Sequence, residues 1–531
     1  MKLVAKYWIY FLLIFLLAVA LRLPRLAQRP MHTDEAVQAF KFGSLLEEGE
    51  YRYDYHEYHG PTLNYLTLFP AWLSFSFQLT DIDEFTLRLV PVIFGLLLLL
   101  LLVLLKDVLG WPAVLLAALF TAISPAMVYY SRYYIMEMLL VCFTFGAIVA
   151  GVHLLQTHRL KWAILTGLFL GLMHATKETW IIALGASVGA LLFRLWQPRA
   201  QTGSLWTPLK AFPKKQGLWL IGVALLVSAL FYSSFLTHPA GIADAFRCYL
   251  TYFQRAGQNV IHEHHWYYYL KLLLFYRVAD GPVWSEGFLL LLAGIGALAA
   301  FTKKETASLN RAFIQFLVVF TGLMILIYSL IPYKTPWCLL GFWHGVILLA
   351  GVGAALLIRR VQKFYGRIVV LLLLLVGSGH LFWQAYLANF QYAASPKNPY
   401  VYAHTSLDIF KIVDRLQAIT GSVAAGKNLY IEVICPGDDY WPLPWYFRNY
   451  PNVGWWHSVD LETPPAPVII ISPAVEADLI HKLYFTPPPG ERNLYLRLFD
   501  DYVELRPGVE LRGYIVKDLW EEFQESSEFK L

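Results

Sequence analysis

Long apolar runs recur along the first three quarters of the chain. Many of them reach the roughly 20 residues that a helix needs to cross a hydrocarbon core about 30 Å thick. Hydropathy predicts about eleven membrane-spanning helices. Their approximate limits are 7–23, 87–105, 112–129, 134–155, 162–175, 179–196, 216–236, 284–301, 312–331, 338–358 and 368–386. The chain is therefore expected to be an α-helical polytopic membrane protein.

The loops between these runs sort by charge. Alternate loops, starting with the N-terminal segment, are rich in Lys and Arg, which places them in the cytoplasm. These loops hold Lys2 and Lys6, Lys106, Arg159 and Lys161, 194–215, Lys303, Lys304 and Arg311, and 359–367. The other loops carry the unusual polar residues, so the chemistry is expected to face away from the cytoplasm. The predicted location is the cell membrane, with a cytoplasmic N-terminus.

One apolar run, 62–78, does not fit this alternation as a span. Counting it as a span would put basic loops on both sides of the membrane. We therefore predict an interfacial helix inside a long external loop, residues 24–86. A true span is the alternative.

The pattern changes at about residue 395, where prolines, charges and short alternating segments replace the long apolar runs. It predicts two buried strands and two amphipathic helices, at 428–434, 467–472, 406–416 and 475–484. Roughly 135 residues suffice for one soluble domain. We therefore expect a membrane domain over 1–390 and an extracytoplasmic α/β domain over 395–531.

Composition agrees with a membrane protein. The 531 residues are 58% hydrophobic and 15% charged, with a mean hydropathy of +0.50, which is too apolar for a soluble chain of this length. The net charge of +5 comes mainly from the cytoplasmic loops, so it indicates topology and no nucleic-acid partner. The four cysteines are scattered, and their spacing predicts neither a zinc site nor a disulfide framework.

An acidic pair, Asp34 and Glu35, follows the first predicted span after a short loop. A carboxylate just outside the bilayer, at the mouth of a helical bundle, is costly to keep and is usually functional. A general base that takes a proton from an acceptor hydroxyl or amine needs such a position in a partly dry cleft. The structural alternative is a helix start, with Thr33 or Asp34 capping a helix over 36–46.

The segment 53–61 gathers three tyrosines, two acids and two histidines. Tyr rings stack on sugars and suit the membrane interface, so the segment, with His59, is a candidate for substrate binding. An aromatic belt is the structural alternative. A metal site from Asp34, Asp54, Glu57 and His59 is another, although its spacing matches no sharp ligand pattern.

Three basic residues lie at predicted external ends of spans: Arg132, Lys177 and Lys334. Snorkelling to the interface explains one such residue. Three basic residues on the external face, which should be poor in positive charge, are better explained as a site that neutralises a phosphate leaving group. Glu137, one turn after Arg132, and Glu178, beside Lys177, belong to the same candidate site.

A second long external loop carries the sequence HEHHWYYY at 262–269. His264 and His265 are candidates for orienting the donor or the acceptor. Metal binding and a structural role are the alternatives, although adjacent histidines cannot all face one ion.

Four features together resemble a known group. They are the acidic pair in the first loop, the acid-then-proline segment before an interfacial helix, the Ser-Arg pair that opens a span with an acid one turn later, and the long aromatic second external loop. They resemble the GT-C membrane glycosyltransferases, especially protein O-mannosyltransferases and lipid A aminoarabinose transferases. The resemblance covers about residues 1–390. Two further motifs, YVYAHTS at 400–406 and WPLPWYFR at 441–448, resemble the narrower flippase-activity-associated family.

The resemblance implies transfer of a sugar from a polyprenyl-phosphate carrier to a lipid, glycan or protein acceptor outside the cytoplasm, usually with inversion. It implies Asp34 as the base and Glu57 as the acid of a second motif. Relatives more often have Pro-Pro and a nearby Lys where this chain has His-Gly-Pro at 59–61, which moves the expected donor-phosphate contacts to Arg132, Lys177 or Lys334.

The relatives closest in mechanism need no metal, whereas oligosaccharyltransferases of the same superfamily do. No cofactor is therefore expected to be required, and a divalent metal is the open alternative.

Two other functions compete with the transferase. The first is an accessory or translocation factor for lipid-linked oligosaccharides. A transporter should show broken helices or repeated halves with charges at mid-bilayer, whereas the charges here gather at one face. The second is a sugar-binding scaffold in which Trp441, Trp445, Trp455 and Trp456 stack on glycan rings. The structural alternative is that the Pro-Leu-Pro-Trp segment packs the C-terminal domain against the helices.

Overall fold

The computed structural model describes residues 2–56, 59–196, 212–255, 262–302 and 309–528. The chain forms two compact units. The first comprises Met1–Ala27, Ser44–Phe77 and Asp83–Tyr402, and the second comprises Gln28–Gly43, Gln78–Ile82 and Ala403–Leu531. The second unit therefore includes two short N-terminal segments in addition to the C-terminal region, and one of them carries Asp34 and Glu35.

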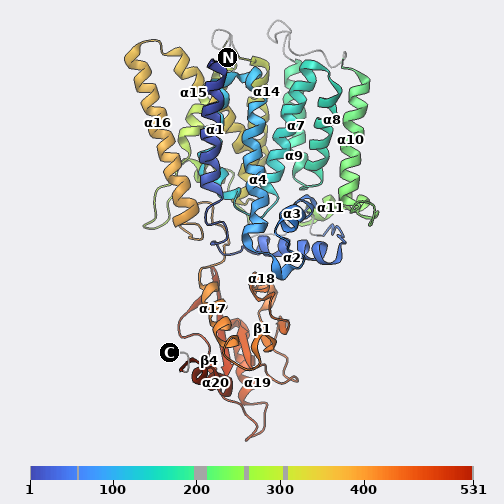
Figure 1. Cartoon of the computed structure of the whole chain (residues 1–531), viewed down its shortest axis with the longest axis vertical. Helices are drawn as coiled ribbons and strands as arrows, with labels where there is room; N and C mark the ends of the chain where they lie inside the picture. The colour runs from blue at the N-terminus through green and yellow to red at the C-terminus, as the bar shows by residue number, and fades with distance from the viewer. Residues whose placement is uncertain (1, 57–58, 197–211, 256–261, 303–308, 529–531) are drawn as a thin grey trace. The chain divides into compact units, whose positions relative to one another are not determined.

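The first unit is a bundle of apolar helices that stand side by side (Figure 1). In the described part of the chain, eight helices are long and apolar enough to cross a membrane. They are α1 (Lys2–Arg22), α4 (Glu84–Val103), α5 (Lys106–Ile123), α7 (Glu137–Thr157), α10 (Lys214–Tyr232), α14 (Arg311–Leu330), α15 (Leu340–Arg360) and α16 (Phe364–Tyr386). Three shorter apolar helices accompany them, α8 (Leu160–His174), α9 (Trp180–Trp196) and α13 (Gly287–Ala299). Each predicted span overlaps one of these helices, although the predicted span 112–129 runs past the end of α5 into the short helix α6 (Pro125–Tyr130). The chain is a multi-pass membrane protein.

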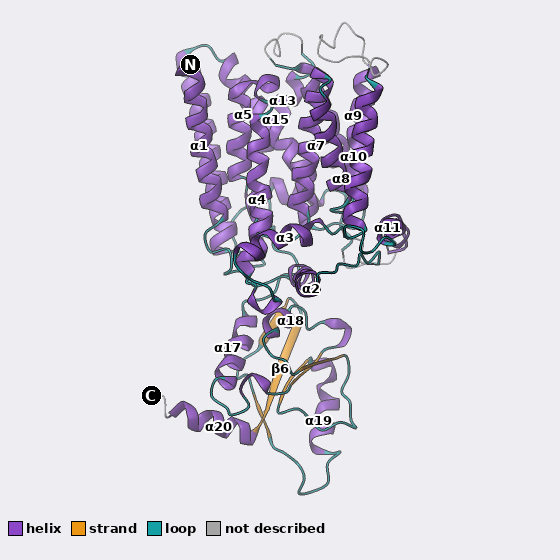
Figure 2. Cartoon of the chain, turned by 45° about the vertical axis from the view of Figure 1, so that its right-hand side comes forward, coloured by secondary structure: helices purple, strands orange, loops and turns teal. Residues whose placement is uncertain are grey.

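Short helices occupy one end of this bundle. Helix α3 (Thr62–Leu73) has 12 residues, a length of about 18 Å, so it is too short to span a bilayer, as predicted for this run. Helix α11 (Gly241–Arg255) runs across the direction of the long helices (Figures 1 and 2). Its Ile242, Phe246 and Leu250 side chains are exposed and share one face, the pattern of a helix that lies on a membrane surface.

Small residues let the long helices approach closely. An added Cβ on Gly296 of α13 would lie 2.2 Å from the Leu349 carbonyl oxygen of α15, and one on Gly353 of α15 would lie 2.0 Å from the Leu292 carbonyl oxygen. Helices in lipid associate mainly through such close packing, because burying apolar side chains away from lipid gives no hydrophobic gain.

The second unit is built on a six-stranded mixed sheet with the strand order β2-β1-β3-β6-β4 and with β5 paired to β6. The strands are β1 (Ile431–Ile434), β2 (Val453–Trp456), β3 (Val468–Ile471), β4 (Tyr495–Arg497), β5 (Val503–Arg506) and β6 (Val509–Val516). Strands β1, β2 and β3 are parallel, with Ile431 opposite Val453 and Val468, whereas β6 runs antiparallel to β3, β4 and β5.

Helices cover both faces of this sheet. Strands β1 and β3 are buried along their whole length, as expected for parallel strands between two helical layers. Helices α17 (Asp408–Thr420), α18 (Leu443–Phe447) and α20 (Lys517–Glu528) pack on one face, and α19 (Glu476–Tyr484) packs on the other. The predicted helical membrane fold with a C-terminal α/β domain is confirmed.

A buried acid ties several parts of the first unit together. Glu286, just before α13, accepts hydrogen bonds from the Ser124 hydroxyl (2.5 Å), the Ala126 amide (3.0 Å), the Tyr400 hydroxyl (2.6 Å) and the Trp343 indole (3.3 Å). The network joins the α5–α6 break, where α6 is Pro125–Tyr130, to α13, α15 and the first residue of the 400–406 motif.

We expect Glu286→Gln to lower the free energy of unfolding by about 1–3 kcal/mol, because the new amide group faces buried donors and leaves them without an acceptor. Thermal unfolding of the detergent-solubilised protein measures this. Glu263→Gln, at an exposed acid, is the matched control. Equal melting temperatures for the two variants would contradict the role given to Glu286.

Candidate functional site

The segment that follows the tyrosine-rich stretch is joined to the loop between α8 and α9. His59 and Lys177 form an antiparallel bridge. The Gly60 amide donates to the Thr176 carbonyl at 3.0 Å, and the Thr62 amide donates to the Ala175 carbonyl at 3.2 Å. Two loops that lie more than a hundred residues apart in the sequence therefore meet at one place, and both carry predicted site residues.

The close approach of these loops explains Gly60. A Cβ at this position would lie 2.2 Å from the Ala175 carbonyl oxygen and 2.9 Å from the Thr176 amide nitrogen. These are backbone atoms, which cannot move aside cheaply. A glycine is therefore required where the chain reads His-Gly-Pro.

We expect Gly60→Ala to destabilise the protein by about 1–3 kcal/mol, the usual cost of forcing an extra methyl into a packed contact. Thermal unfolding in detergent is the measurement. Gly151→Ala is the matched control, because no atom lies within 4 Å of a Cβ added there. If Gly60→Ala melts at the same temperature as Gly151→Ala, the two loops do not pack as described.

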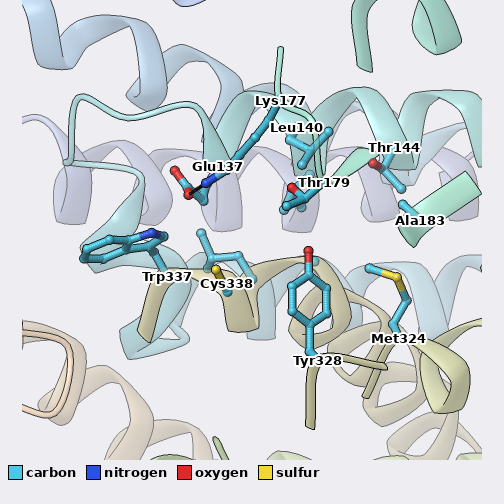
Figure 3. A pocket seen from close by; sticks show the side chains of 13 residues that line it. Glu137, Leu140, Thr144, Lys177, Thr179, Ala183, Met324, Tyr328, Trp337 and Cys338 are labelled. Carbon is cyan, nitrogen blue, oxygen red and sulfur yellow. Dashed lines mark hydrogen bonds and ion pairs between the residues drawn. The ribbon is translucent and has the colours of Figure 1, made fainter. Parts of the chain in front are cut away.

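Four predicted site residues form a chain of charged groups at this junction. The Lys177 ammonium donates to Glu137 Oε1 at 2.5 Å, and His59 Nδ1 lies 3.1 Å from Glu178 Oε2. The side chains of Glu137, Lys177 and Glu178 are 8%, 9% and 3% exposed, whereas that of His59 is 29% exposed. Figure 3 shows the Lys177 ammonium directed at the Glu137 carboxylate. The imidazole is thus the member of this cluster that a ligand can reach most easily.

The electrostatics of the cluster favour the charged forms of Lys177 and Glu178. Burial alone would lower the pKa of Lys177, but Glu137 and Glu178 outweigh it and raise that pKa well above the usual value. Burial alone would raise the pKa of Glu178, but His59 and Lys177 outweigh it and lower that pKa. Buried charges are tolerated when they are paired in this way.

A small cavity adjoins the ion pair. Its lining includes Glu137, Lys177, Tyr328, Trp337 and Cys338 (Figure 3). Its volume is about 20 Å³, enough for about one water molecule and too small for a sugar ring. The segment just after Lys334 therefore lies beside the Glu137–Lys177 pair.

Arg132 lies at the end of α1. Its guanidinium donates to main-chain carbonyls at 2.8 to 3.3 Å, those of Leu21, Arg22, Pro24 and Arg25. It also lies over the Phe390 ring, 4.9 Å from the centroid. A cation that satisfies the last carbonyls of a helix stabilises the helix end, so the geometry favours a structural role. Phosphate binding by Arg132 stays a prediction.

Lys334 joins the histidine-rich loop to the end of α14. Its ammonium donates to the carbonyls of Ile331 and of His264, the latter at 3.0 Å, and its amide donates to the His262 carbonyl at 2.9 Å. Burial lowers the pKa of both Lys334 and His264. The His264 ring stacks on Tyr268 at 4.2 Å, and the His265 ring stacks on Tyr267 at 5.2 Å. These contacts organise the loop, and substrate binding by these residues stays a prediction.

The acidic pair belongs to the second unit, at the start of α2 (Thr33–Glu48). Glu35 is buried, and its carboxylate accepts from Arg29 at 2.9 Å and from the His32 amide at 3.0 Å. It therefore caps the helix start in the manner of a capping box. The Asp34 side chain is 48% exposed, so Asp34 is the acid of the pair that can reach a substrate.

Glu57 lies outside the described residues, so its catalytic role stays a prediction. Within the residues that the structure describes, no group of three or more His, Cys, Asp or Glu side chains is arranged to hold a metal ion. That no metal is required stays a prediction.

Glu286 and Arg29 were not among the residues predicted from the sequence. Glu286 lies within the predicted span 284–301 and was counted as part of it. An acidic residue at the start of an apolar run nevertheless indicates a buried polar contact. Arg29 lies six residues before its partner Glu35. Side chains six residues apart do not contact one another in a regular helix or strand, so this pair carried no signal in the sequence.

Comparison with known proteins places the fold among those of characterised enzymes. Residues 67–207 match the family described as dolichyl-phosphate-mannose-protein mannosyltransferase. The structure of ArnT from Cupriavidus metallidurans bound to undecaprenyl phosphate is similar over 98% of this chain and 99% of that chain, with a TM-score of 0.61 and 14% identity. The chain has a GT-C glycosyltransferase-like fold.

This GT-C-like fold extends to a second group of structures. The oligosaccharyltransferase of Archaeoglobus fulgidus, tethered to an acceptor peptide, is similar over 85% of this chain with a TM-score of 0.54 and 11% identity. The chain spans 63% of the length of that enzyme. No curated protein sequence matches the chain.

Proposed function

We propose that the protein is a membrane glycosyltransferase that moves a sugar from a polyprenyl-phosphate carrier to an acceptor on the extracytoplasmic side. The observation that carries the proposal is the similarity, along nearly the whole of both chains, to ArnT bound to undecaprenyl phosphate. The family match over residues 67–207, described by a dolichyl-phosphate-linked donor, supports the same class of donor.

Asp34 is the proposed general base. Its accessible carboxylate takes the proton from an acceptor hydroxyl or amine, and the freed electron pair attacks the anomeric carbon of the donor. The bond from that carbon to the phosphate oxygen breaks, and the polyprenyl phosphate leaves with the electron pair. One such displacement inverts the anomeric centre. The phosphate is already a good leaving group, so no acid catalyst is needed.

His59, backed by Lys177, is the proposed contact for the donor phosphate. The donors of Arg132 and Lys334 are directed at main-chain carbonyls, whereas the His59 imidazole is partly exposed. A protonated imidazole has two N–H donors, so one can face Glu178 while the other serves a phosphate oxygen. Preorganised donors of this kind stabilise the charge that develops on a leaving group.

The proposal is tested with purified protein in lipid nanodiscs and a panel of radiolabelled polyprenyl-phosphate sugars. We expect at least one donor to release free lipid phosphate in a reaction that depends on an added acceptor fraction. The competing function, translocation, predicts instead that a labelled lipid crosses the bilayer of a proteoliposome while its sugar–phosphate bond stays intact. That result, with no release from any donor, would overturn the transferase proposal.

A further inference from the structure

The motifs at 400–406 and 441–448 have no part in the proposed chemistry, yet residues of both contact the loop that carries Asp34. We propose that the C-terminal part of the second unit is the support that fixes Asp34, with Thr405 and Tyr446 as positioning residues. This inference rests on the proposed function, because it assigns a purpose to the placement of the base.

The two motifs hold the peptide groups of Met31 from both sides. The Met31 amide donates to the Tyr446 hydroxyl at 2.8 Å, and the Met31 carbonyl accepts from the Thr405 hydroxyl at 2.6 Å. Met31 is fully buried and Thr405 is 1% exposed. A residue three positions before the base is therefore held by one side chain from each motif.

His32 connects the buried Met31 to Asp34 through a hydrogen bond. The Asp34 amide donates to His32 Nδ1 at 3.0 Å, which leaves the proton of a neutral imidazole on Nε2. The His32 ring lies 5.0 Å from the ring of His404, the residue before Thr405. The His32 carbonyl accepts from the Ala36 amide at 2.9 Å, the first turn of α2. Hydrogen bonds therefore hold the backbone at His32 and at Asp34 itself.

Residues on either side of Asp34 are held as well. Glu35 is buried against Arg29. The Thr33 hydroxyl accepts from Arg506 Nη1 at 3.4 Å, and Arg506 Nη2 is bound to Asp439 at 2.8 Å. Asp34 therefore presents a half-exposed carboxylate from a backbone whose neighbours are fixed.

Arg448 anchors the other N-terminal segment of the second unit. Its guanidinium lies 3.8 Å from the centre of the buried Trp445 ring. It donates to the Ile82 carbonyl at 2.8 Å and to the Leu79 carbonyl at 3.3 Å. The Leu79 side chain packs against Gly43 of α2. A Cβ added to Gly43 would lie 3.0 Å from a methyl carbon of Leu79. The 441–448 motif thus contacts the chain both before and beyond the first turns of α2.

Catalysis by a positioned base is sensitive to such support, because a displacement of about 1 Å can reduce a rate about 10²-fold. Loss of either hydrogen bond to Met31 should move Asp34 without removing any group that touches substrate. The expected signature is a lower kcat with an unchanged KM for the donor. A residue that only stabilises the sheet has no reason to produce this signature together with a local loosening of the loop.

The test measures hydrogen exchange of the full-length protein in nanodiscs together with transfer kinetics, using dolichyl-phosphate mannose as the probe donor. We expect Tyr446→Phe and Thr405→Val each to speed exchange in peptide 28–36 by about 5-fold, as for loss of one hydrogen bond, and to lower kcat. Thr405→Ser, which keeps the hydroxyl, should restore both values.

Two matched controls remove a comparable buried hydrogen bond elsewhere in the second unit. Tyr495 donates to the Ala466 carbonyl at 2.9 Å, and Thr420 donates to the Leu416 carbonyl at 2.8 Å. Tyr495→Phe and Thr420→Val should leave exchange in peptide 28–36 unchanged.

Unchanged exchange in peptide 28–36 of Tyr446→Phe and Thr405→Val, or equal acceleration in the controls, would overturn the inference. If the wild type transfers no sugar from any donor, the proposed function fails, while the exchange data still decide whether the motifs hold this loop.

Discussion

Replacing Asp34 with Asn is expected to slow sugar transfer by about 10²–10⁴-fold, the usual contribution of a general base, while the protein stays folded in the membrane. Asn has the shape of Asp but cannot accept the proton of the acceptor. The Asp34 side chain is 48% exposed, so the substitution leaves no buried group without a partner. The measurement is release of lipid phosphate under single-turnover conditions, with thermal unfolding to show that the fold is kept.

Two further acids of α2 serve as comparisons for this experiment. Glu48→Gln changes an exposed acid near the far end of the helix and should leave the rate unchanged. Glu35→Gln weakens the buried contact with Arg29 and should lower the melting temperature, which Asp34→Asn should not do. Full turnover by Asp34→Asn would remove this residue from the role of base.

Replacing Lys177 with Met is expected to lower the free energy of unfolding by about 3–5 kcal/mol, the usual cost of breaking a buried ion pair from one side. The change leaves the buried Glu137 carboxylate without its ammonium partner, 2.5 Å away in the wild type. Urea or thermal unfolding of the protein in detergent measures the loss. The double variant Lys177→Met with Glu137→Leu should recover part of it, because no unpaired charge then remains at that position.

The loss of stability should depend on pH. The cluster lowers the pKa of Glu178 below its usual value of 4.5, so its contribution to folding is present above that pH and is lost as the pH falls through the native-state value. His59 and, to a smaller extent, Lys177 lower this pKa, so the part of the difference between wild type and Lys177→Met that comes from Glu178 should be present at neutral pH and shrink in acid. A double variant less stable than Lys177→Met would show that the buried charge is not the cause.

Hydropathy was enough to find the long helices. The run 62–78 also needed the charges of the loops, which rejected it as a span, and α3 has only 12 residues. Strand β1 and helix α19 were likewise predicted within a few residues of Ile431–Ile434 and Glu476–Tyr484. These signals are local, which is why they could be read from neighbouring residues.

The roles of single charged residues could not be read in the same way. Asp34 and Glu35 are adjacent and chemically alike, and only the contact with Arg29 makes one buried and the other accessible. Arg132 was predicted to bind a phosphate from its charge and position alone, and its contacts with main-chain carbonyls at the end of α1 could not be foreseen because carbonyls carry no sequence signal. The bridge between His59 and Lys177 is a long-range pairing, so the sequence placed the two residues in one site without showing how they meet.

Locating a bound lipid phosphate is the most direct test of the proposed site. The measurement is a cryo-electron microscopy structure of the protein in nanodiscs with undecaprenyl phosphate. Density for the phosphate within hydrogen-bond distance of the His59 imidazole, beside the Lys177–Glu137 pair, is the predicted result. A phosphate bound instead at Arg132 or Lys334, with the His59–Glu178 contact undisturbed, would contradict it.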